Sequence, residues 1–267
     1  MPAIQPARLK QQTARLCSFH DQPEIFVREL HRLLRQYSEL TQRAGQAGVP
    51  PSLMDSYHVP SPVLRQIMID LKPLVGQAPE ASLALSEALW KEPYYEFRLL
   101  AANLLGQIPV SPSTTIMGTI RNWLSEELDN RLIQAVIQHG MARLRRDSPQ
   151  SLLDLAQDWL AEDQIYPKRC CLITLQSLLT EKSFENIPFI FRIITPLLRA
   201  VPSDLKADLV ILLHALALES PQETAFILRK NLETSDHPDT PWLIRQVIAD
   251  LPPTYQENLR QAMKSAA

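Results

Sequence analysis

The stretch from Ser86 to Pro109, SEALWKEPYYEFRLLAANLLGQIP, constrains the fold more than any other part of the sequence. Apolar residues recur every three or four positions on both sides of Pro93, which is the period of two helices that each bury one face. Pro93 suits the first position of the second helix, Gly106 suits a left-handed C-cap, and Pro109 prevents continuation. A pair of this kind leaves apolar surface on both sides, so it needs further pairs stacked against it.

Proline and glycine usage favours an all-helical chain. The 267 residues include 22 prolines and 6 glycines, and neither Asn-Gly nor Asp-Gly occurs, so hairpin turns lack their usual residues. Within this pattern, Pro73 and Gly76 predict a helix end, and Pro196 predicts a kink or a break. We therefore expect an all-α solenoid of stacked antiparallel helix pairs, folded as a single domain over residues 1–267.

Charge, cysteine content and motifs exclude several classes of protein. The formal net charge is −2, which gives no support to wholesale nucleic-acid binding but leaves room for a local basic face. The cysteines, Cys17, Cys170 and Cys171, lack Cys-x-x-Cys spacing, so we expect neither disulfides nor a metal site. No apolar run is long enough to span a bilayer, and no phosphate-loop or dinucleotide motif occurs. The sequence predicts a cytoplasmic protein with no metal, no small-molecule cofactor and no membrane contact.

Two segments carry a resemblance to a known family. YHVPSPVLRQIM (57–68) and EALWKEPYYEFRLLAANLL (87–105) are similar to the opening of the HEAT-like repeat DNA glycosylases that remove alkylated purines. The matching residues are Val59, Leu64, Arg65, Leu89, Trp90, Glu96, Arg98, Ala101, Leu104 and Leu105. A weaker match follows at DWLAEDQIYPKRCCLITLQSLL (158–179), with Trp159 and Arg169 in place and Tyr166 where the family usually has tryptophan. The resemblance implies a HEAT-like solenoid and DNA as a partner.

The same resemblance implies which positions would carry base excision. The family is expected to use an aspartate four residues after a tryptophan, plus a second tryptophan on a later helix, because these groups stabilise the developing sugar cation. The family's spacing places Asp129 at the first tryptophan, Gln134 at the aspartate and Ile211 at the second tryptophan. None of the three supplies the required group. We therefore expect no excision by the family's usual mechanism.

One pair of residues offers an alternative catalytic site. Trp123 and Glu127 lie four residues apart on one predicted helical face, in the order that the family uses, but on the helix before the expected one. In one interpretation the pair is a relocated site in an active alkylpurine DNA glycosylase. In the other, Trp123 is a packing residue and Glu127 is a solvated carboxylate.

A set of basic residues provides candidate ligands for DNA phosphates: Arg65, Arg98, Arg145, Lys168 and Arg169. On one concave face of a repeat stack they would contact the backbone without reading bases. Alternatively they are helix-end charges scattered over the surface, with Arg169 in an ion pair, for example with Asp163 or Glu162. We expect a divergent DNA alkylation repair-like protein that binds the DNA backbone. The alternatives are a protein-binding HEAT-repeat scaffold and the glycosylase with a relocated site.

Overall fold

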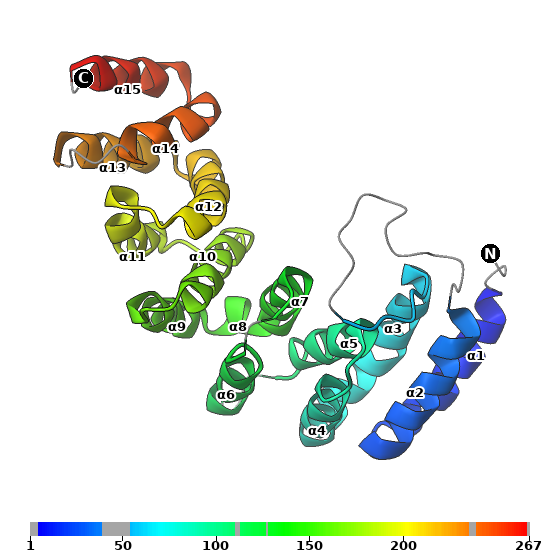
Figure 1. Cartoon of the computed structure of the whole chain (residues 1–267). Helices are drawn as coiled ribbons and strands as arrows, with labels where there is room; N and C mark the ends of the chain where they lie inside the picture. The colour runs from blue at the N-terminus through cyan, green and yellow to red at the C-terminus, as the bar shows by residue number, and fades with distance from the viewer. Residues whose placement is uncertain (1–4, 39–53, 110–112, 127, 235–238, 266–267) are drawn as a thin grey trace. The chain divides into compact units, whose positions relative to one another are not determined.

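The computed structural model describes residues 5–38, 54–109, 113–126, 128–234 and 239–265. Within these ranges the chain forms fifteen α-helices, one π-helix and two 3-10 helices, and no strand (Figure 1). The helices pack against one another throughout, which confirms the predicted all-α fold. The chain divides into two compact units, Met1–Leu144 and Arg145–Ala267. The single domain expected over residues 1–267 stays a prediction.

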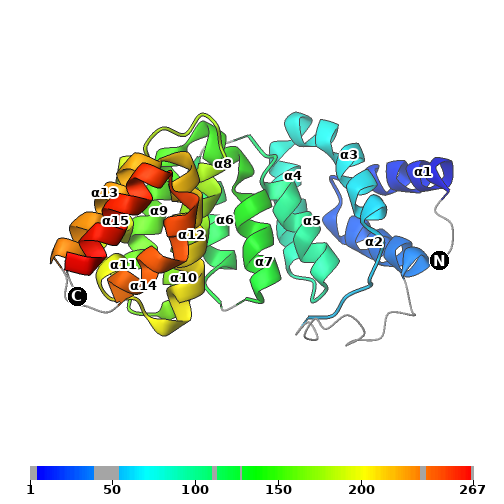
Figure 2. The ribbon, with the colours of Figure 1, turned by 90° about the horizontal axis from the view of Figure 1, so that it is seen from above.

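Most helices of the first unit lie side by side in contact. In chain order they are α1 (Pro6–Cys17), α2 (Pro23–Tyr37), α3 (Ser61–Gln77), α4 (Pro79–Trp90), α5 (Tyr95–Leu105), α6 (Ser113–Trp123), α7 (Asn130–Ala135) and the π-helix η1 (Val136–Gly140). α4 packs along α5, and α3 contacts α1, α4 and α5 (Figure 2). α2 lies against α1 and α4, while η1 lies against α5. The two helices expected between Ser86 and Pro109 are therefore α4 and α5, and they form a packed pair.

The apolar faces expected for this pair form the core of the first unit. Leu85 and Leu89 of α4, and Phe97 and Leu104 of α5, have no exposed surface. Each such side chain contributes about 1.5–3 kcal/mol through its removal from water. The helical spacing of these residues thus predicted the buried face correctly, because the stripe of apolar residues on each helix faces the other helix or its neighbours.

The start of α5 differs from the prediction. The helix begins at Tyr95, not at Pro93. The cause is Tyr94, whose backbone is extended (φ −100°, ψ 136°) because it forms an isolated parallel bridge with Asp55. The Tyr95 N–H donates to the Asp55 carbonyl oxygen at 2.9 Å. A contact with a distant segment therefore overrides the local preference of proline for the first helical turn.

Gly106 follows α5 for a reason that the sequence did not indicate. Its φ is −71°, so the left-handed C-cap expected there is wrong. The π-helix passes so close that a Cβ on Gly106 would lie 1.7 Å from the carbonyl oxygen of His139. The Met141 N–H donates to the Val136 carbonyl oxygen, five residues back, which is the spacing of a π-turn. Glycine is required at this position by close approach of two backbones.

Two prolines lie inside helices instead of ending them. α3 continues through Pro73 to Gln77, and α11 (Ile187–Arg199) continues through Pro196. The helix end expected from Pro73 and Gly76 is thus found one residue after Gly76, but Pro73 itself does not end the helix. Of the kink or break expected at Pro196, the break is wrong. Both prolines are exposed and lie near the C-terminal ends of their helices. The carbonyl group that each leaves without its helical partner can thus bond to water, which keeps the cost of the proline small.

The second unit alternates its helices between two layers. After α8 (Ala142–Asp147), which crosses the boundary between the units, come α9 (Pro149–Ala161), α10 (Ile165–Leu179), α11, the 3-10 turn η2 (Ser203–Leu205), α12 (Lys206–Glu219), α13 (Pro221–Thr234), α14 (Asp239–Val247), η3 (Ile248–Asp250) and α15 (Pro253–Ser265). α10, α12 and α14 contact one another in that order, as do α9, α11, α13 and α15. α9 packs along α10, and α12 packs along α13. This pattern is that of stacked helix pairs.

Candidate functional site

A cavity of about 770 Å³ lies in the first unit, between α3, α5, α7, η1 and the segment 56–60 that precedes α3. Part of its wall is apolar and comes from α3 and α5, with Leu64, Met68 and Leu99. The rest is polar: Arg65, Arg131 and Glu96 supply charge, and His58 and His139 supply polar rings. We refer to this space as the basic cavity. Its mixture of an apolar wall and a few convergent polar groups is typical of ligand-binding sites.

The carboxylate of Glu96 holds the segment before α3 in place. It is buried, and it accepts hydrogen bonds from the Ser56 hydroxyl (2.7 Å) and from the Tyr57 and His58 backbone N–H groups (3.1 and 2.8 Å). Glu96 also lies in the first turn of α5, where the helix dipole favours a negative charge. The Glu96 carboxylate is therefore held in place by donors of the protein itself.

His58 adopts an unusual backbone conformation at the edge of the basic cavity. Its φ is 51°, in the left-handed region that residues other than glycine rarely occupy. Its N–H group is fixed by two acceptors, Glu96 Oε1 and the Ser56 hydroxyl (3.1 Å). These bonds explain how the conformation persists, since a strained residue needs surroundings that determine its geometry. The His58 side chain is exposed beside the cavity.

Two arginines supply the fixed positive charge of the basic cavity. Arg65 projects from α3 and is exposed. Arg131, on α7, places its guanidinium over the ring of Tyr95, 4.3 Å from the ring centroid. Among the residues that line this cavity, Glu96 is the one carboxylate. The local charge is therefore positive although the whole chain has a net charge of −2.

Sequence reasoning named Val59, Leu64, Arg65 and Glu96 for their match to the family, but among the cavity residues it predicted a binding role for Arg65 alone. Arg131, Tyr95, His58 and His139 come from three separate segments and share no motif spacing. Only the packing of η1 and α7 against α5 brings them together. The one sequence feature that could have indicated this cavity was Arg131, a basic residue two positions after the helix cap at Asp129.

Arg98 and Trp123 belong to a single layered stack in the first unit. The Trp123 ring lies parallel to that of Trp90, with centroids 4.2 Å apart and planes at 5°. The Arg98 guanidinium covers Trp90 at 5.2 Å, and its Nε donates to the Glu92 carbonyl oxygen at 3.1 Å. Burial lowers the pKa of Arg98 below its ordinary value. Trp123 is 4% exposed, so its faces are used in packing. Glu127, its proposed catalytic partner, lies outside the described residues.

The remaining cations among the candidates are Arg145, Lys168 and Arg169, and they belong to the second unit. Arg169 is held by hydrogen bonds, and Arg145 is buried. Arg169 Nε donates to Asp208 Oδ2 at 3.0 Å, and its Nη2 donates to the Asp204 carbonyl oxygen at 2.9 Å. The structural ion pair considered for Arg169 thus exists, but its partner is Asp208. Arg145 is buried, and burial lowers the pKa of its guanidinium, an effect opposed by the charge of Glu181.

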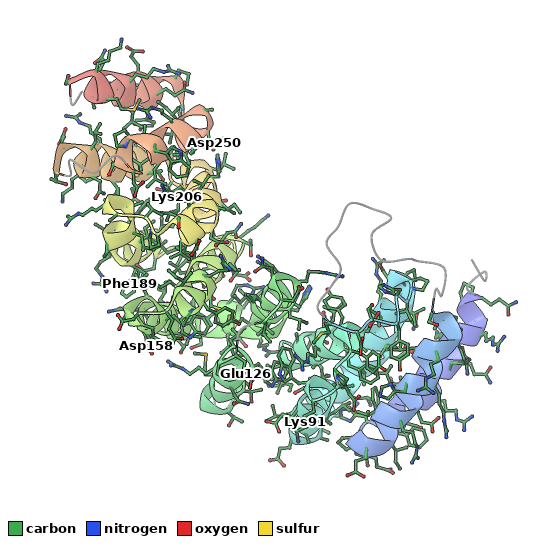
Figure 3. The ribbon with its side chains drawn as sticks, in the orientation of Figure 1. Lys91, Glu126, Asp158, Phe189, Lys206 and Asp250 are labelled. Carbon is green, nitrogen blue, oxygen red and sulfur yellow. The ribbon has the colours of Figure 1, made fainter. Side chains whose placement is uncertain are left out.

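Lys168 lines a separate cavity in the second unit. This cavity, of about 400 Å³, lies between α9, α10 and α11, and Arg192 also lines it. Arg192 is exposed, and its guanidinium lies over the Phe189 ring at 4.0 Å from the centroid (Figure 3). Arg65 and Arg98 therefore belong to one unit, whereas Arg145, Lys168 and Arg169 belong to the other. The expectation that all five form one surface stays a prediction.

The structure gives other surroundings to the three positions that the resemblance assigns to excision. Asp129 is the N-cap of α7, and its side chain accepts from the Arg131 N–H at 2.8 Å. Gln134 is exposed on α7, and Ile211 is exposed on α12. Gln134 carries no charge, and neither Asp129 nor Ile211 has an aromatic face. In the part of the chain that the structure describes, these positions offer neither a carboxylate nor an aromatic ring in the family's arrangement.

The described residues also bear on metal binding, on membrane crossing and on thiol reactivity. Among the described residues, no group of three or more His, Cys, Asp or Glu side chains is placed to bind a metal ion. Over the same ranges, no helix combines the length and the apolar character needed to cross a bilayer. The three thiols are buried, and burial raises the pKa of Cys17 and that of Cys170 to about 12. They therefore lack the thiolate character of reactive cysteines.

Comparison with known proteins gives one match. A family model described as DNA alkylation repair enzyme matches residues 30–227, which extend from α2 to α13 and include every residue of the basic cavity named above. No curated protein and no solved structure gives a match. Since the family model covers more than half of the 267 residues, the chain belongs to the DNA alkylation repair enzyme family.

Proposed function

We propose that the protein binds the DNA backbone through the rim of the basic cavity and does not excise bases by the family's usual mechanism. The observation that carries this proposal is the charge balance of the cavity. Arg65 and Arg131 are exposed there, and no carboxylate among the described residues forms an ion pair with either, while Glu96 accepts three hydrogen bonds. Exposed guanidinium groups of this kind bind phosphate through charge-assisted hydrogen bonds.

The absence of excision follows from the chemistry of the replaced positions. A sugar cation that develops at the scissile bond needs a negative charge close to it. Gln134 supplies a neutral amide in place of the family's carboxylate. Trp123 is committed to its stack with Trp90, which argues against its use as a nucleotide platform.

A salt titration tests the binding proposal. Fluorescence anisotropy with a labelled duplex should show weak, sequence-independent binding that falls steeply with salt. Arg65→Ala and Arg131→Ala should each flatten the slope of log K against log salt by about one unit. The matched control is Arg229→Ala on α13, because Arg229 is equally exposed to solvent but is paired with Glu233 at 2.8 Å. Failure of the wild type to bind duplex DNA at low salt would overturn the proposal.

An excision assay tests the catalytic part separately. Purified protein incubated with methylated duplex DNA should release no alkylated purine above background. Single-turnover release that disappears in Glu127→Gln would instead assign catalysis to the Trp123 and Glu127 pair.

A protein-binding role is the second candidate, and exposed apolar residues favour it. Ile211, Leu218 and Phe226, on α12 and α13 of the second unit, are 47%, 71% and 62% exposed. Large apolar side chains at this exposure are common at interaction surfaces when they are grouped. An absence of DNA binding together with retained folding would leave the scaffold as the remaining function.

A further inference from the structure

The cavity between α9, α10 and α11 combines an apolar floor with two cations. We refer to this space, which encloses about 400 Å³, as the α9–α11 groove. Its floor includes Ile193 and Leu197 of α11, which are buried, and Leu160 of α9. Lys168 and Arg192 supply the charge. All of these residues belong to the second unit, so the groove is a site apart from the basic cavity.

The rim of the α9–α11 groove is exposed to solvent. Gln157 and Ala161 of α9 and Pro196 of α11 line it, and all three are exposed. Sites for small molecules usually enclose most of the ligand surface. A groove with an exposed rim instead leaves one side of its occupant in water, as happens when a protein segment docks on the surface of a helical-repeat protein. These features favour a protein segment as the occupant.

The positive charge of the α9–α11 groove is not balanced by the protein. None of the described residues that line it carries a carboxylate, and no described carboxylate forms an ion pair with Lys168 or Arg192. Lys168 also lies in the first turn of α10, where the positive end of the helix dipole adds to the field and no acidic residue compensates. An anionic group in the groove would therefore be stabilised by both effects.

Arg192 is held in a position from which it can bind a carboxylate. Its guanidinium lies over the Phe189 ring of the same helix, 4.0 Å from the ring centroid (Figure 3). This contact restricts the guanidinium, which lowers the entropy cost of ordering it on a ligand. Because Arg192 is exposed, the N–H groups at the edge of the guanidinium can form bidentate hydrogen bonds to a carboxylate.

We propose that the α9–α11 groove docks an acidic segment of a partner protein. Carboxylates of the segment contact Lys168 and Arg192, and its apolar side chains lie on the floor that Ile193 and Leu197 form. The floor distinguishes such a segment from DNA, since a phosphodiester backbone is charged and hydrated throughout and gains nothing from apolar surface. Recognition of acidic motifs by arginine is a recurring mode of peptide binding. This inference goes beyond the proposed function, because it needs no DNA.

A defined peptide tests the inference on the full chain. The probe is the labelled hexapeptide Glu-Leu-Phe-Asp-Leu-Leu with blocked ends, and fluorescence anisotropy measures its binding. The uncharged isostere Gln-Leu-Phe-Asn-Leu-Leu should bind about tenfold more weakly, since it lacks the charge-assisted hydrogen bonds. The peptide Glu-Ser-Ser-Asp-Ser-Ser keeps the charge but lacks the apolar side chains, and it should also bind at least about tenfold more weakly.

A neutral substitution tests the role of charge. Arg192→Gln should weaken binding of the acidic peptide about tenfold and leave binding of the uncharged isostere unchanged. The matched control is Arg199→Gln, because Arg199 is exposed on the same helix but does not line the groove. Lys168→Gln removes the other cation and serves if Arg192→Gln fails to fold.

A larger side chain tests the role of the groove itself. Ala161→Trp fills the groove from α9 without removing either cation, and it should abolish binding of the acidic peptide. The matched control is Ala200→Trp, since Ala200 is an exposed alanine directly after α11 that does not line the groove. A thermal melt of each variant, followed by circular dichroism, confirms that the comparison is made between folded proteins.

The possible outcomes separate this inference from the proposed function. No binding of the acidic peptide to the wild type, or equal binding of the uncharged isostere, would overturn the docking site and leave the DNA proposal intact. A fall in affinity for duplex DNA in both Arg192→Gln and Ala161→Trp would assign the groove to phosphates and overturn a protein partner. Failure of duplex DNA to bind, with binding of the acidic peptide retained, would overturn the proposed function alone.

Discussion

The arginines of the basic cavity differ from two cations of the second unit in their surroundings. At the basic cavity, Arg65 and Arg131 are exposed, and no carboxylate among the described residues forms an ion pair with either. In the second unit, Arg169 is bonded to Asp208, and Lys206 donates to Asp239 Oδ1 at 2.9 Å. Figure 3 labels Lys206 where α12 begins. For this reason we take a basic residue as a candidate phosphate ligand only when no carboxylate of the protein already neutralises it.

This difference also separates the basic residues that remain candidate phosphate ligands from those that do not. Arg169 matches a family motif, yet its guanidinium forms hydrogen bonds from α10 to η2 and α12. Arg131 matches no motif, yet it lines the cavity and its side chain is exposed. The predictions below test this contrast, beginning with the largest expected effect.

Gly106→Ala should disrupt the first unit. The added Cβ would lie 1.7 Å from a backbone oxygen of η1, and backbone cannot move aside as a flexible side chain can. We expect a loss of about 3 kcal/mol or more in the free energy of unfolding, measured by urea denaturation. The matched control is Gly76→Ala on α3, where a Cβ meets nothing within 4 Å. That control should be neutral or more stable by about 0.5–1 kcal/mol.

Labelling of the buried thiols would show which unit unfolds more readily in Gly106→Ala. Cys17 belongs to the first unit, whereas Cys170 and Cys171 belong to the second. In Gly106→Ala, a thiol-specific reagent followed by peptide mass spectrometry should label Cys17 faster than in the wild type. Unchanged labelling of Cys170 and Cys171 would show that the units open independently. Equal acceleration at all three would support the single cooperative domain expected from the sequence.

Glu96→Gln should cost about 2 kcal/mol of stability. The amide has one oxygen to offer where the carboxylate accepts three hydrogen bonds, so a backbone N–H is left without its acceptor. A thermal melt measures the change. If Glu96 acted mainly as a countercharge to Arg65, the substitution would tighten DNA binding and leave the melting temperature unchanged, contrary to our expectation.

The fold was predictable from the sequence, whereas most of the site was not. Helical periodicity identified the faces that carry Leu89 and Phe97, because burial of an apolar stripe depends on local spacing. The role of Gly106 was hidden, since it depends on a π-helix more than thirty positions away in the chain. Arg131 was missed for the same reason: its stack on Tyr95 is a tertiary contact that leaves no local pattern.

Arg169→Ala should lower stability and leave DNA binding unchanged. Loss of the partly buried ion pair with Asp208 removes about 1 kcal/mol, which corresponds to a fall of about 2–4 °C in melting temperature for a chain of this size. The salt slope of DNA binding should equal that of the wild type. A slope flattened by one unit would show that Arg169 contacts phosphate, and the contrast between the units would fail.

His20 should make a small, pH-dependent contribution to the first unit. Its Nε2 lies 2.8 Å from the Ser82 hydroxyl, whose own proton is donated to the Ala78 carbonyl oxygen, so the neutral imidazole donates from Nε2. Burial lowers the pKa of His20 below 6.5, against the opposing charge of Asp21. The unfolded chain therefore binds more protons below about pH 6.5, and stability falls as the pH decreases.

The loss from His20 is expected below about pH 6.5, where the unfolded chain takes up the proton before the folded protein does. Chemical denaturation at several pH values measures it. His20→Gln should flatten the dependence in this interval. An unchanged dependence would mean that other groups cause it.

The parallel stack of Trp90 and Trp123 has a consequence for spectroscopy. Two indoles 4.2 Å apart with nearly parallel planes are close enough for their electronic transitions to couple, so the near-ultraviolet spectrum of the pair depends on the stack. Trp159 and Trp242, the other two tryptophans of the chain, lie in the second unit, where the described residues include no ring stacked on either. The protein thus carries an intrinsic optical label for its first unit, and the melting of that unit can be followed without attaching a dye.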